Sequence, residues 1–306
     1  MRNKNTVAQL QMHGGMAYVI QLCDGRFIVI DGGEVINEVC YQMNKRVLYD
    51  YLQKRSSVDR IRVACWVITH FHSDHVDVAA RFLREHRDEL DVESFLYNYA
   101  PNVEFFTDGE REEELSREAA WDEAMANYPN ATRICPRSGD SLSFGNVNVR
   151  VLATALDPYP EKPTNANVIS LVMKLTFESG RSFMVLGDAT SERLTSLIDP
   201  ESEIYCTEEM LKSDILQVAH HGLAVGREFE YPSITALYEK IAPRTAFWAI
   251  NEKRFFTDKW CRDPSKTYHK FLFDTVGKNN YNNSYTTVVY MEDLSVSFEK
   301  YYDDSE

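Results

Sequence analysis

The sequence predicts an α/β protein in the form of a four-layer αββα sandwich, with two β-sheets packed face to face and helices on the outer face of each. Three observations support this class. Short β-rich runs recur along the 306 residues, helical stretches separate them, and the run 61–69 ends in residues that are apolar on both faces, as in a central strand. No low-complexity linker divides the chain, so we expect a single domain over 1–306 with two similar β-rich halves, about 1–150 and 151–306.

The first half is expected to begin with a β-hairpin. Two runs rich in β-branched and aromatic residues, 17–22 and 26–30, flank the turn signal Asp24-Gly25 and deliver Asp31 at the end of the hairpin. A buried strand then ends at Thr69, directly before a group of histidines. The other elements expected in this half are helices over about 35–55, 76–90 and 110–128 and a strand over 92–97. We interpret the many charges of the last helix as a solvated face.

The second half repeats this alternation of strands and helices. Strands are expected near 147–152, 169–176, 182–186, 215–219, 245–250, 286–290 and 294–298, and helices near 191–198, 233–241 and 266–276. Two halves of this kind, each with helices between its strands, give the two sheets of the predicted sandwich.

Composition and charge exclude several classes of protein. With 44% hydrophobic and 26% charged residues, the chain has the make-up of an ordinary globular protein and not of a disordered or collagen-like one. The net charge of -14 and the pI near 5.1 disfavour an extended nucleic-acid partner. The net charge does not exclude a small pocket that is charged by metal ions, because bound ions are not included in a charge calculated from the composition.

No segment of the sequence predicts contact with a membrane. The longest apolar run, 63–68, is far shorter than the roughly 20 residues of a membrane-spanning helix. The first residues lack the apolar region of a secretory signal, so we expect a cytoplasmic protein. Six scattered cysteines include no Cys-x-x-Cys pair, which argues against a thiolate zinc site. The sequence leaves the oligomeric state open.

The feature that carries chemistry is the run Thr69-His70-Phe71-His72-Ser73-Asp74-His75. On an extended segment His70 and His72 point to the same side, because side chains alternate with period two. A tight turn into the following helix would bring Asp74 and His75 to the same place. Imidazole and carboxylate together suit Zn²⁺ or a similar divalent ion such as Mn²⁺, so we expect a metal site here rather than a polar helix cap.

Three motifs resemble those of the metallo-β-lactamase-fold hydrolases. They are the His-x-His-x-Asp-His run after an apolar strand and an Asp-Gly-Gly turn, the Gly-Asp that ends 183–188, and the His-His-Gly that ends 214–222. Together with the run 167–172, their order and spacing are similar to the ComEC-type branch and to the bacterial phosphorylcholine esterases of that branch. The resemblance covers about residues 12–250 and implies the αββα fold and metal-dependent hydrolysis.

The resemblance also implies metal-binding roles for the motif residues. His70 and His72 would hold a first metal, and Asp74 and His75 a second. Asp188 would bridge the two. The expected cofactor is therefore one or two zinc ions, with Mn as the other candidate.

Further roles follow from the same resemblance. Of the adjacent pair His220 and His221, it favours His221 as the last ligand of the second metal and leaves His220 facing the substrate, as a phosphate contact or proton donor. Asp74 and His220 are the candidate catalytic residues. Asp31 would orient a ligand histidine and set its tautomer, although Asp is also common in plain turns.

The sequence departs from the family at the first metal. A further histidine usually stands between the first cluster and the bridging aspartate, whereas 87–219 contains none. Asn167 could contribute its carbonyl oxygen there, hold the substrate, or simply begin a strand. At 13–17, Gly14 and Met16 replace the amide and the acid of a Gly-Gln-Gly-Asp-Ala element, so the roles of that element are not carried over.

These features predict a metal-dependent hydrolase that uses a metal-activated water on a phosphodiester or another small, phosphate-containing substrate. A thioester, lactone or β-lactam is the alternative substrate. The Pro-rich loop 157–167 could present Tyr159 and Lys162 to the substrate or be an ordinary surface loop. Two other classes stay open: a di-iron oxidoreductase, which would need an acidic residue or a histidine at the missing position, and a catalytically impaired metal-binding or sensor module.

Overall fold

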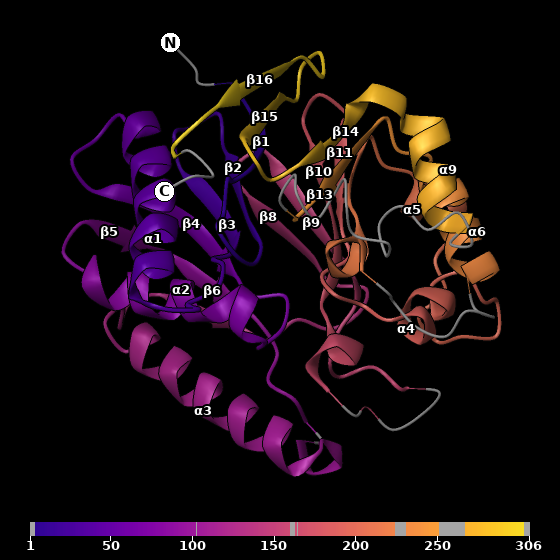
Figure 1. The fold of residues 1–306 in the computed structure, drawn as a ribbon, viewed down its shortest axis with the longest axis horizontal. Coiled ribbons are helices and arrows are strands. Elements are labelled where there is room, and N and C mark those ends of the chain that lie inside the picture. Colours follow the sequence, from indigo (N-terminus) through magenta and orange to yellow (C-terminus); the bar gives the residue numbers. More distant parts are fainter. Residues whose placement is uncertain are drawn as a thin grey trace.

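Two β-sheets form the centre of the molecule (Figure 1). The computed structural model describes residues 4–101, 103–159, 163, 165–223, 231–250 and 267–302. Within these ranges the first sheet has nine strands, in the order β16-β15-β1-β2-β3-β4-β6-β7 with β5 also paired to β4. The second has seven, in the order β14-β13-β12-β11-β10-β9-β8.

The strands are short, and each sheet is bounded by helices. The first sheet consists of β1 (Thr6–Gln9), β2 (Ala17–Gln21), β3 (Phe27–Asp31), β4 (Ile61–Val67), β5 (Leu90–Val92), β6 (Ser94–Leu96), β7 (Thr132–Ile134), β15 (Thr286–Tyr290) and β16 (Val296–Glu299). The second consists of β8 (Ser141–Phe144), β9 (Val147–Ala153), β10 (Val172–Phe177), β11 (Ser182–Val185), β12 (Ile215–Gln217), β13 (Thr245–Trp248) and β14 (Asn280–Asn282). The α-helices are α1 (Glu38–Arg55), α2 (Ser73–Glu85), α3 (Asp108–Met125), α4 (Ser191–Ser196), α5 (Glu208–Leu211), α6 (Tyr231–Ile241) and α9 (Thr267–Val276), and the 3₁₀ turns are η1 (Val103–Phe105), η2 (Ala166–Ile169), η3 (Ala219–Gly222) and η5 (Gly277–Asn279).

Alternation along the strands builds three apolar layers. On β3, Phe27 and Val29 pack under the helices of the first sheet, while Ile28 and Ile30 face the second sheet. On β13, Phe247 meets them in the central layer and its neighbours face the helices on the other side. Both faces of each central strand are therefore buried, as the sequence predicted for 61–69.

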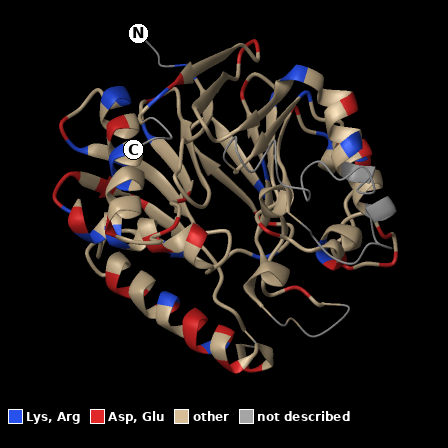
Figure 2. Ribbon diagram, in the orientation of Figure 1, with Lys and Arg blue, Asp and Glu red and all other residues tan. Residues whose placement is uncertain are grey.

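The helices lie on the two outer faces of the sandwich. Helices α1, α2 and α3 cover the first sheet, and α4, α5, α6 and α9 cover the second, with the sheets between them (Figure 1). Charged residues are frequent along these outer helices, and several acidic residues lie along α3 (Figure 2). The predicted α/β class and four-layer αββα arrangement are confirmed.

Several element boundaries differ from the sequence prediction. The helix expected from 76 begins at Ser73, so Asp74 and His75 occupy its first turn and not a separate turn before it. The helix expected from Val35 begins at Glu38, because the Asn37 side chain accepts a hydrogen bond from the backbone of the first turn and caps it there. The sequence also missed β1, β7, β8, β14 and α5, which are only three or four residues long and carry too few positions to show a period.

The sheets do not follow the expected division of the chain near residue 150. Strands β8 and β9 belong to the second sheet, whereas β15 and β16 return to the first, where β15 pairs antiparallel with β1. Both sheets thus draw strands across the expected boundary between the halves. The single domain over 1–306 stays a prediction.

Parallel pairing sets the place of the candidate site. Strands β3 and β4 are parallel in the first sheet, and β11, β12 and β13 are parallel in the second. The carboxyl ends of parallel strands lie at one edge, where the loops that follow them converge. At this edge the backbone N–H of Leu171 donates to the carbonyl oxygen of Thr69 at 2.8 Å and links the two sheets.

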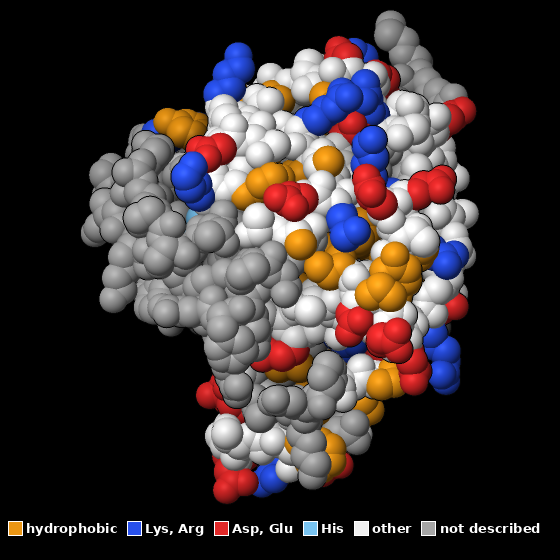
Figure 3. Space-filling view, turned by 90° about the vertical axis from the view of Figure 1, so that its right-hand side faces the viewer, with side chains coloured by type: hydrophobic (Ala, Val, Ile, Leu, Met, Phe, Trp, Pro, Cys, Tyr) orange, Lys and Arg blue, Asp and Glu red, His pale blue; other side chains and the backbone are white. Residues whose placement is uncertain are grey.

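The surface carries charges of both signs. On the face turned to the viewer in Figure 3, lysine and arginine side chains are interspersed with aspartate and glutamate among the residues that are coloured. In the described ranges no helix is both long and apolar enough to cross a membrane. The described cysteines 23, 40, 65, 135 and 206 are free, and Cys261 lies outside the described residues.

A glycine at the contact between β3 and α2 gives a test of this packing. A Cβ atom on Gly32 would lie 2.6 Å from the backbone nitrogen of Ala79, so Gly32→Ala must displace α2. We expect it to lower the free energy of unfolding by about 1–3 kcal/mol in urea denaturation. Gly109→Ala is the matched control, because nothing lies within 4 Å of that position and α3 should gain up to about 1 kcal/mol. Equal stability of Gly32→Ala and the wild type would contradict the packing described.

Candidate metal centre

Four loops at the carboxyl edge of the sheets bring the predicted site residues together. Asp31 ends β3, and the histidine-rich run follows β4. In the second sheet Asp188 follows β11, and the pair His220 and His221 follows β12. Residues 157 positions apart in the chain, from Asp31 to Asp188, therefore meet at one place.

The tightest group of side chains is Asp74, His75, Asp188 and His221. Among the described residues, these offer ligand atoms that all lie within 4.8 Å of one another. Asp188 Oδ2 is 3.3 Å from Nε2 of His75 and 3.3 Å from Nε2 of His221. Asp74 Oδ2 is 3.0 Å from Nε2 of His221. This group unites the four residues that the resemblance assigns to the second metal.

Asp31 fixes the orientation of His75. It is fully buried with φ +59°, a strained value for a residue other than glycine. Its Oδ2 accepts a hydrogen bond from Nδ1 of His75 at 2.8 Å, and the backbone and hydroxyl of Thr69 donate to its two oxygens at 2.8 Å each. The Nε2 atom of His75 is thereby directed at Asp188. This contact matches the predicted position of Asp31, whose function is still a proposal.

His70 and His72 lie beside the tight group and outside it. Their ring centroids are 4.8 Å apart, so both point toward the same side of the loop. Nε2 of His70 is 4.0 Å from Asp188 Oδ2. Nε2 of His72 is 4.0 Å from Oε2 of Glu110, at the start of α3. The side chain of His70 is fully buried, whereas that of His72 is 25% exposed.

The pair His220 and His221 lies on a strained turn. Both have positive φ, +50° and +57°, and Gly222 at φ +84° packs so closely on Trp248 that a Cβ would lie 2.3 Å from its ring. Nδ1 of His221 donates to the carbonyl oxygen of Ala249 at 2.9 Å, which directs its Nε2 into the group. Nε2 of His220 instead lies 3.9 Å from Asp188 Oδ2. The two histidines thus occupy different places, and their roles stay predictions.

The charges of the group balance one another. Burial alone would raise the pKa of Asp188, but His221 and His75 outweigh it and hold this pKa well below its usual value. Burial would likewise lower the pKa values of the two histidines, yet the carboxylates raise that of His221 to about 10 and that of His75 well above its usual value. His70 differs, since burial lowers its pKa well below the ordinary range. The metal-free group is therefore a set of carboxylate and imidazolium pairs beside a neutral imidazole.

Several buried ligand atoms make no hydrogen bond of good geometry, although Nε2 of His75 and Nε2 of His221 lie within ion-pair distance of the carboxylates. They are Nε2 of His70, Nε2 of His75, Nε2 of His221 and Oδ1 of Asp188. A buried polar atom without a partner is costly, and four at one place call for a common partner. A divalent cation suits all of them, because imidazole nitrogen and carboxylate oxygen are its ordinary ligands. The residues present thus fit a metal ion.

The sequence did not reveal how the Asp188 loop is held. Gln217, fully buried at the end of β12, accepts hydrogen bonds from the backbone N–H groups of Leu186 and Gly187 at 2.7 Å each. Its Nε2 donates to the carbonyl oxygens of Gly187 and Val218 at 2.9 and 2.7 Å. All four hydrogen-bonding positions of the amide are used, and they join the loop of Asp188 to the turn of His221. The only signal in the sequence is a polar residue inside an apolar strand.

The glycine-rich loop 13–17 supports the other carboxylate of the group. The backbone N–H of Met16 donates to the carbonyl oxygen of Asp74 at 2.9 Å, and the Met16 side chain is buried in the central layer. A Cβ on Gly15, which has φ +79°, would lie 2.1 Å from that same oxygen. Met16 thus contacts the centre through its backbone, while its apolar side chain packs between the sheets.

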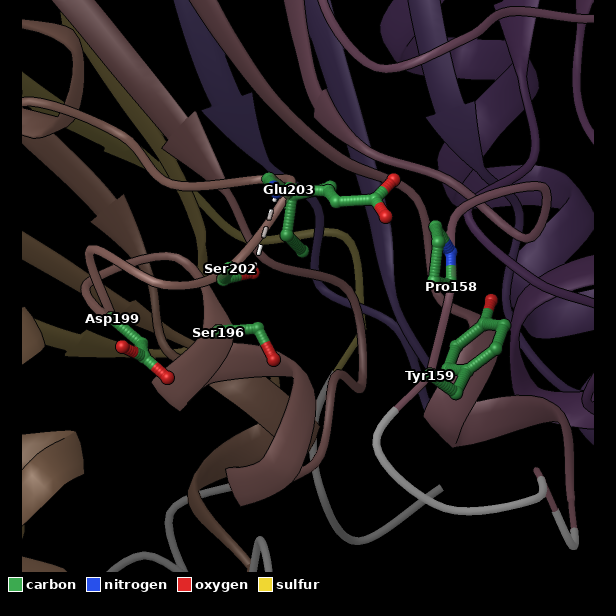
Figure 4. Close-up of a pocket in the computed structure, with 7 residues that line it drawn as sticks. Pro158, Tyr159, Ser196, Asp199, Ser202 and Glu203 are labelled. Atoms are coloured by element: carbon green, nitrogen blue, oxygen red, sulfur yellow. Dashed lines mark hydrogen bonds between the residues drawn. The ribbon is translucent and has the colours of Figure 1, made fainter.

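Asn167 and Tyr159 lie on the second-sheet side of the centre. Asn167 is in η2, where its Nδ2 is 3.4 Å from Nε2 of His220 and its Oδ1 is buried without a partner. Tyr159 stacks on the buried guanidinium of Arg193 at 4.0 Å and faces Ser196, Asp199, Ser202 and Glu203 across a separate pocket of ≈ 230 Å³ (Figure 4). Lys162 lies outside the described residues.

Comparisons with known proteins support the fold. A scan against protein-family models and a search of curated proteins find no match. A mutant of CmlA β-hydroxylase has a TM-score of 0.52 at 12% identity, over 92% of this chain and 53% of CmlA. YhfI from Bacillus subtilis, a metallo-β-lactamase fold protein, has a TM-score of 0.48 at 11% identity, over 91% of this chain and 95% of YhfI. A diphosphatase from the PhnP family has a TM-score of 0.42 at 12% identity, over 79% of this chain and 85% of that one.

Of these solved structures, YhfI is described as a metallo-β-lactamase fold protein, CmlA as a β-hydroxylase and the third as a diphosphatase. At these identities the likeness concerns the fold. This chain spans about half the length of CmlA.

Removing the amide of Gln217 should loosen the centre. Gln217→Met keeps the size of the side chain but leaves two backbone N–H groups unpaired, so we expect affinity for Zn²⁺ to fall about 10–100-fold in chelator competition. Gln11→Met is the matched control, because Gln11 is also fully buried and bonds the backbone of Tyr301 and Tyr302. The control should lose stability but not metal affinity. Equal losses of affinity in both variants would refute a specific role for Gln217.

Metal uptake should release protons. Because the pKa values of His75 and His221 are raised, both imidazoles are protonated at pH 7.5 in the metal-free group, and a cation must displace those protons. Affinity should therefore rise with pH up to about 10, with release of about two protons per ion at pH 7.5. Calorimetric titrations in buffers of different ionisation enthalpy measure this number. Release of no protons would contradict the charge state described.

Proposed function

We propose that this protein is a metal-dependent hydrolase of a phosphodiester or another small, phosphate-containing substrate. The observation that carries the proposal is the group of Asp74, His75, Asp188 and His221, whose ligand atoms all lie within 4.8 Å of one another at the carboxyl edge of both sheets. One or two zinc ions, with Mn²⁺ as the other candidate, are the proposed cofactor.

Divalent ions at this centre would activate a water molecule and offset negative charge on the attacked group. Asp188 holds the two halves of the centre together, since it lies 3.3 Å from both His75 and His221. Asp31 and the carbonyl oxygen of Ala249 each hold an Nδ1 proton and so present both Nε2 atoms to the centre. Asp74 is 29% exposed, and we assign it the proton of the attacking water.

His220 is the proposed proton donor to the leaving oxygen. Its side chain is 26% exposed at 3.9 Å from Asp188, so it can reach both the centre and a bound substrate. The amide of Asn167 lies 3.4 Å from the same imidazole and adds a donor for a phosphate oxygen. Two neutral or cationic donors beside a cationic centre suit an anionic substrate.

Two further points support a phosphate-containing substrate of small size. The order of the metal-binding motifs is similar to the ComEC-type branch, whose resemblance implies phosphodiester chemistry. The net charge of -14 repels a long polyanion but acts weakly inside a pocket whose own potential is set by bound cations.

The paired histidines provide the decisive variants. His220→Ala should lower kcat on bis(p-nitrophenyl) phosphate about 10²–10⁴-fold and leave metal content unchanged, because it removes a proton donor and not a ligand. His221→Ala and Asp188→Ala should lose both metal and activity. His13→Ala, at an exposed histidine, is the control and should behave as the wild type.

Metal content by mass spectrometry separates the possible failures of this proposal. Purified protein that binds no divalent metal would refute it. Loss of metal in His220→Ala but not in His221→Ala would reverse the assignment within the pair. Full metal content with no turnover of phosphodiesters, thioesters, lactones or β-lactams would leave a binding module in place of a hydrolase.

A further inference from the structure

The first metal position has a carboxylate within reach that the sequence motifs do not include. His70 and His72 supply two imidazoles there, and Asp188 supplies a shared carboxylate, but the usual third histidine is missing from 87–219. Beside His72 the structure places Glu110, with its Oε2 4.0 Å from the imidazole Nε2. Glu110 comes from the first turn of α3, an element whose charges the sequence analysis treated as a solvated face.

The separation of these two atoms, 4.0 Å, lies within the range that two ligands of one ion can have. A distance of 4.0 Å is too long for a hydrogen bond. Zinc bonds of 2.0–2.2 Å to nitrogen and oxygen allow two ligand atoms of one ion to lie at most about 4.3 Å apart. His70 Nε2 and Asp188 Oδ2 are also 4.0 Å apart. Each pair therefore leaves room for a cation between its own two atoms, although among the described residues these four atoms are not gathered as closely as those of the second position.

Helix α3 is held firmly enough to position a ligand. It packs along α2, the helix whose first turn carries Asp74 and His75 (Figure 1). Arg117 of α3 reaches Asp77 of α2 with Nε to Oδ1 at 3.6 Å. Beyond the end of α3, the hydroxyl of Tyr128 donates to the carbonyl oxygen of Leu83 at 2.8 Å. These contacts join the middle of α3 and the segment after its end to α2, and the helix carries Glu110 in its first turn.

We propose that Glu110 is the third protein ligand of the first metal, in place of the missing histidine. The inference rests on the proposed metal-dependent function and names a residue for it. The first position would then have His70, His72, Glu110 and the shared Asp188. This is the same complement of two imidazoles and two carboxylates as the second position. Carboxylate in place of imidazole makes the first position more suitable for Mn²⁺ or Fe²⁺ than a three-histidine site.

Asn167 is the competing candidate for the third protein ligand of the first metal. Its amide lies beside His220, where it is 3.4 Å from Nε2, and we assign it to the substrate. Glu110 instead lies beside His72, which is itself a first-position residue. A carboxylate is also the stronger ligand, because it brings a negative charge to the cation.

The neighbouring Glu113 provides a matched control. It lies one turn along on the same helix, is 65% exposed, and pairs with Arg117 at 2.9 Å instead of facing the centre. Glu110→Gln and Glu113→Gln remove the same charge from the same helix. Only the first should change metal binding if Glu110 is a ligand.

The experiment titrates metal-free protein with Mn²⁺ and follows free Mn²⁺ by electron paramagnetic resonance. Wild type and Glu113→Gln should bind two ions, whereas Glu110→Gln should bind one of the two about 10–100-fold more weakly, with an unchanged unfolding transition. Glu110→His should restore two-ion binding and shift the preference from Mn²⁺ toward Zn²⁺.

Other results would overturn the assignment. Two-ion binding by Glu110→Gln at wild-type affinity, or loss of the weaker ion in Asn167→Ala in its place, would show that Glu110 is not a ligand while the proposed hydrolase stands. Binding of a single ion by the wild type, with an affinity that Glu110→Gln does not change, would also show that Glu110 is not a ligand while the proposed hydrolase stands. A wild-type protein that binds no metal at all would remove both the inference and the proposed function.

Discussion

The structure of the candidate centre depends on the burial of one carboxylate. Asp188 is 2% exposed, and a carboxylate at such a place is tolerated only when positive charge surrounds it. His75 and His221 supply that charge from the two sheets, each at 3.3 Å. Because each partner comes from a different sheet, the compensation of this one charge also fixes how the sheets meet. The hydrogen bond from Leu171 to Thr69 beside it is the backbone counterpart of the same contact.

Strain at the centre is offset by packing around it. Asp31, His220 and His221 all have positive φ, which costs about 1–3 kcal/mol for each such residue. The turn of the two histidines ends at Gly222, which packs directly on the ring of Trp248. The Trp248 ring in turn stacks on that of Phe273, with the ring centroids 5.3 Å apart. The apolar layer beneath the second sheet thus maintains backbone conformations that the turn would not adopt alone.

The sequence predicted the fold class because strands and helices have a visible period, whereas the meeting of the motif residues was implied by the resemblance of the motifs to those of the metallo-β-lactamase-fold hydrolases. Strand alternation gives the layers, and motifs placed after parallel strands must meet at one edge. The role of Gln217 escaped prediction, since a side chain that bonds to backbone some 30 residues away leaves no pattern in its own neighbourhood. The place of Glu110 beside His72 escaped prediction for the opposite reason: it lies in a helix so rich in charge that one carboxylate near the histidine loop cannot be told from the rest. The membership of β8 and β9 in the second sheet was hidden because pairing between distant strands is set by tertiary contacts.

The pairing of β1 with β15 has a consequence for how the chain folds. Thr6 lies opposite Tyr290, so β1 pairs with a strand that lies far along the chain and is synthesised much later. Until then β1 has an unpaired edge, which is open to association with other chains. Contacts so far apart in sequence also form slowly, because a long loop must close before they contribute any stability. We therefore expect folding to be completed only after synthesis has passed residue 290, and this protein to depend on chaperones during that interval more than a fold with local pairing would.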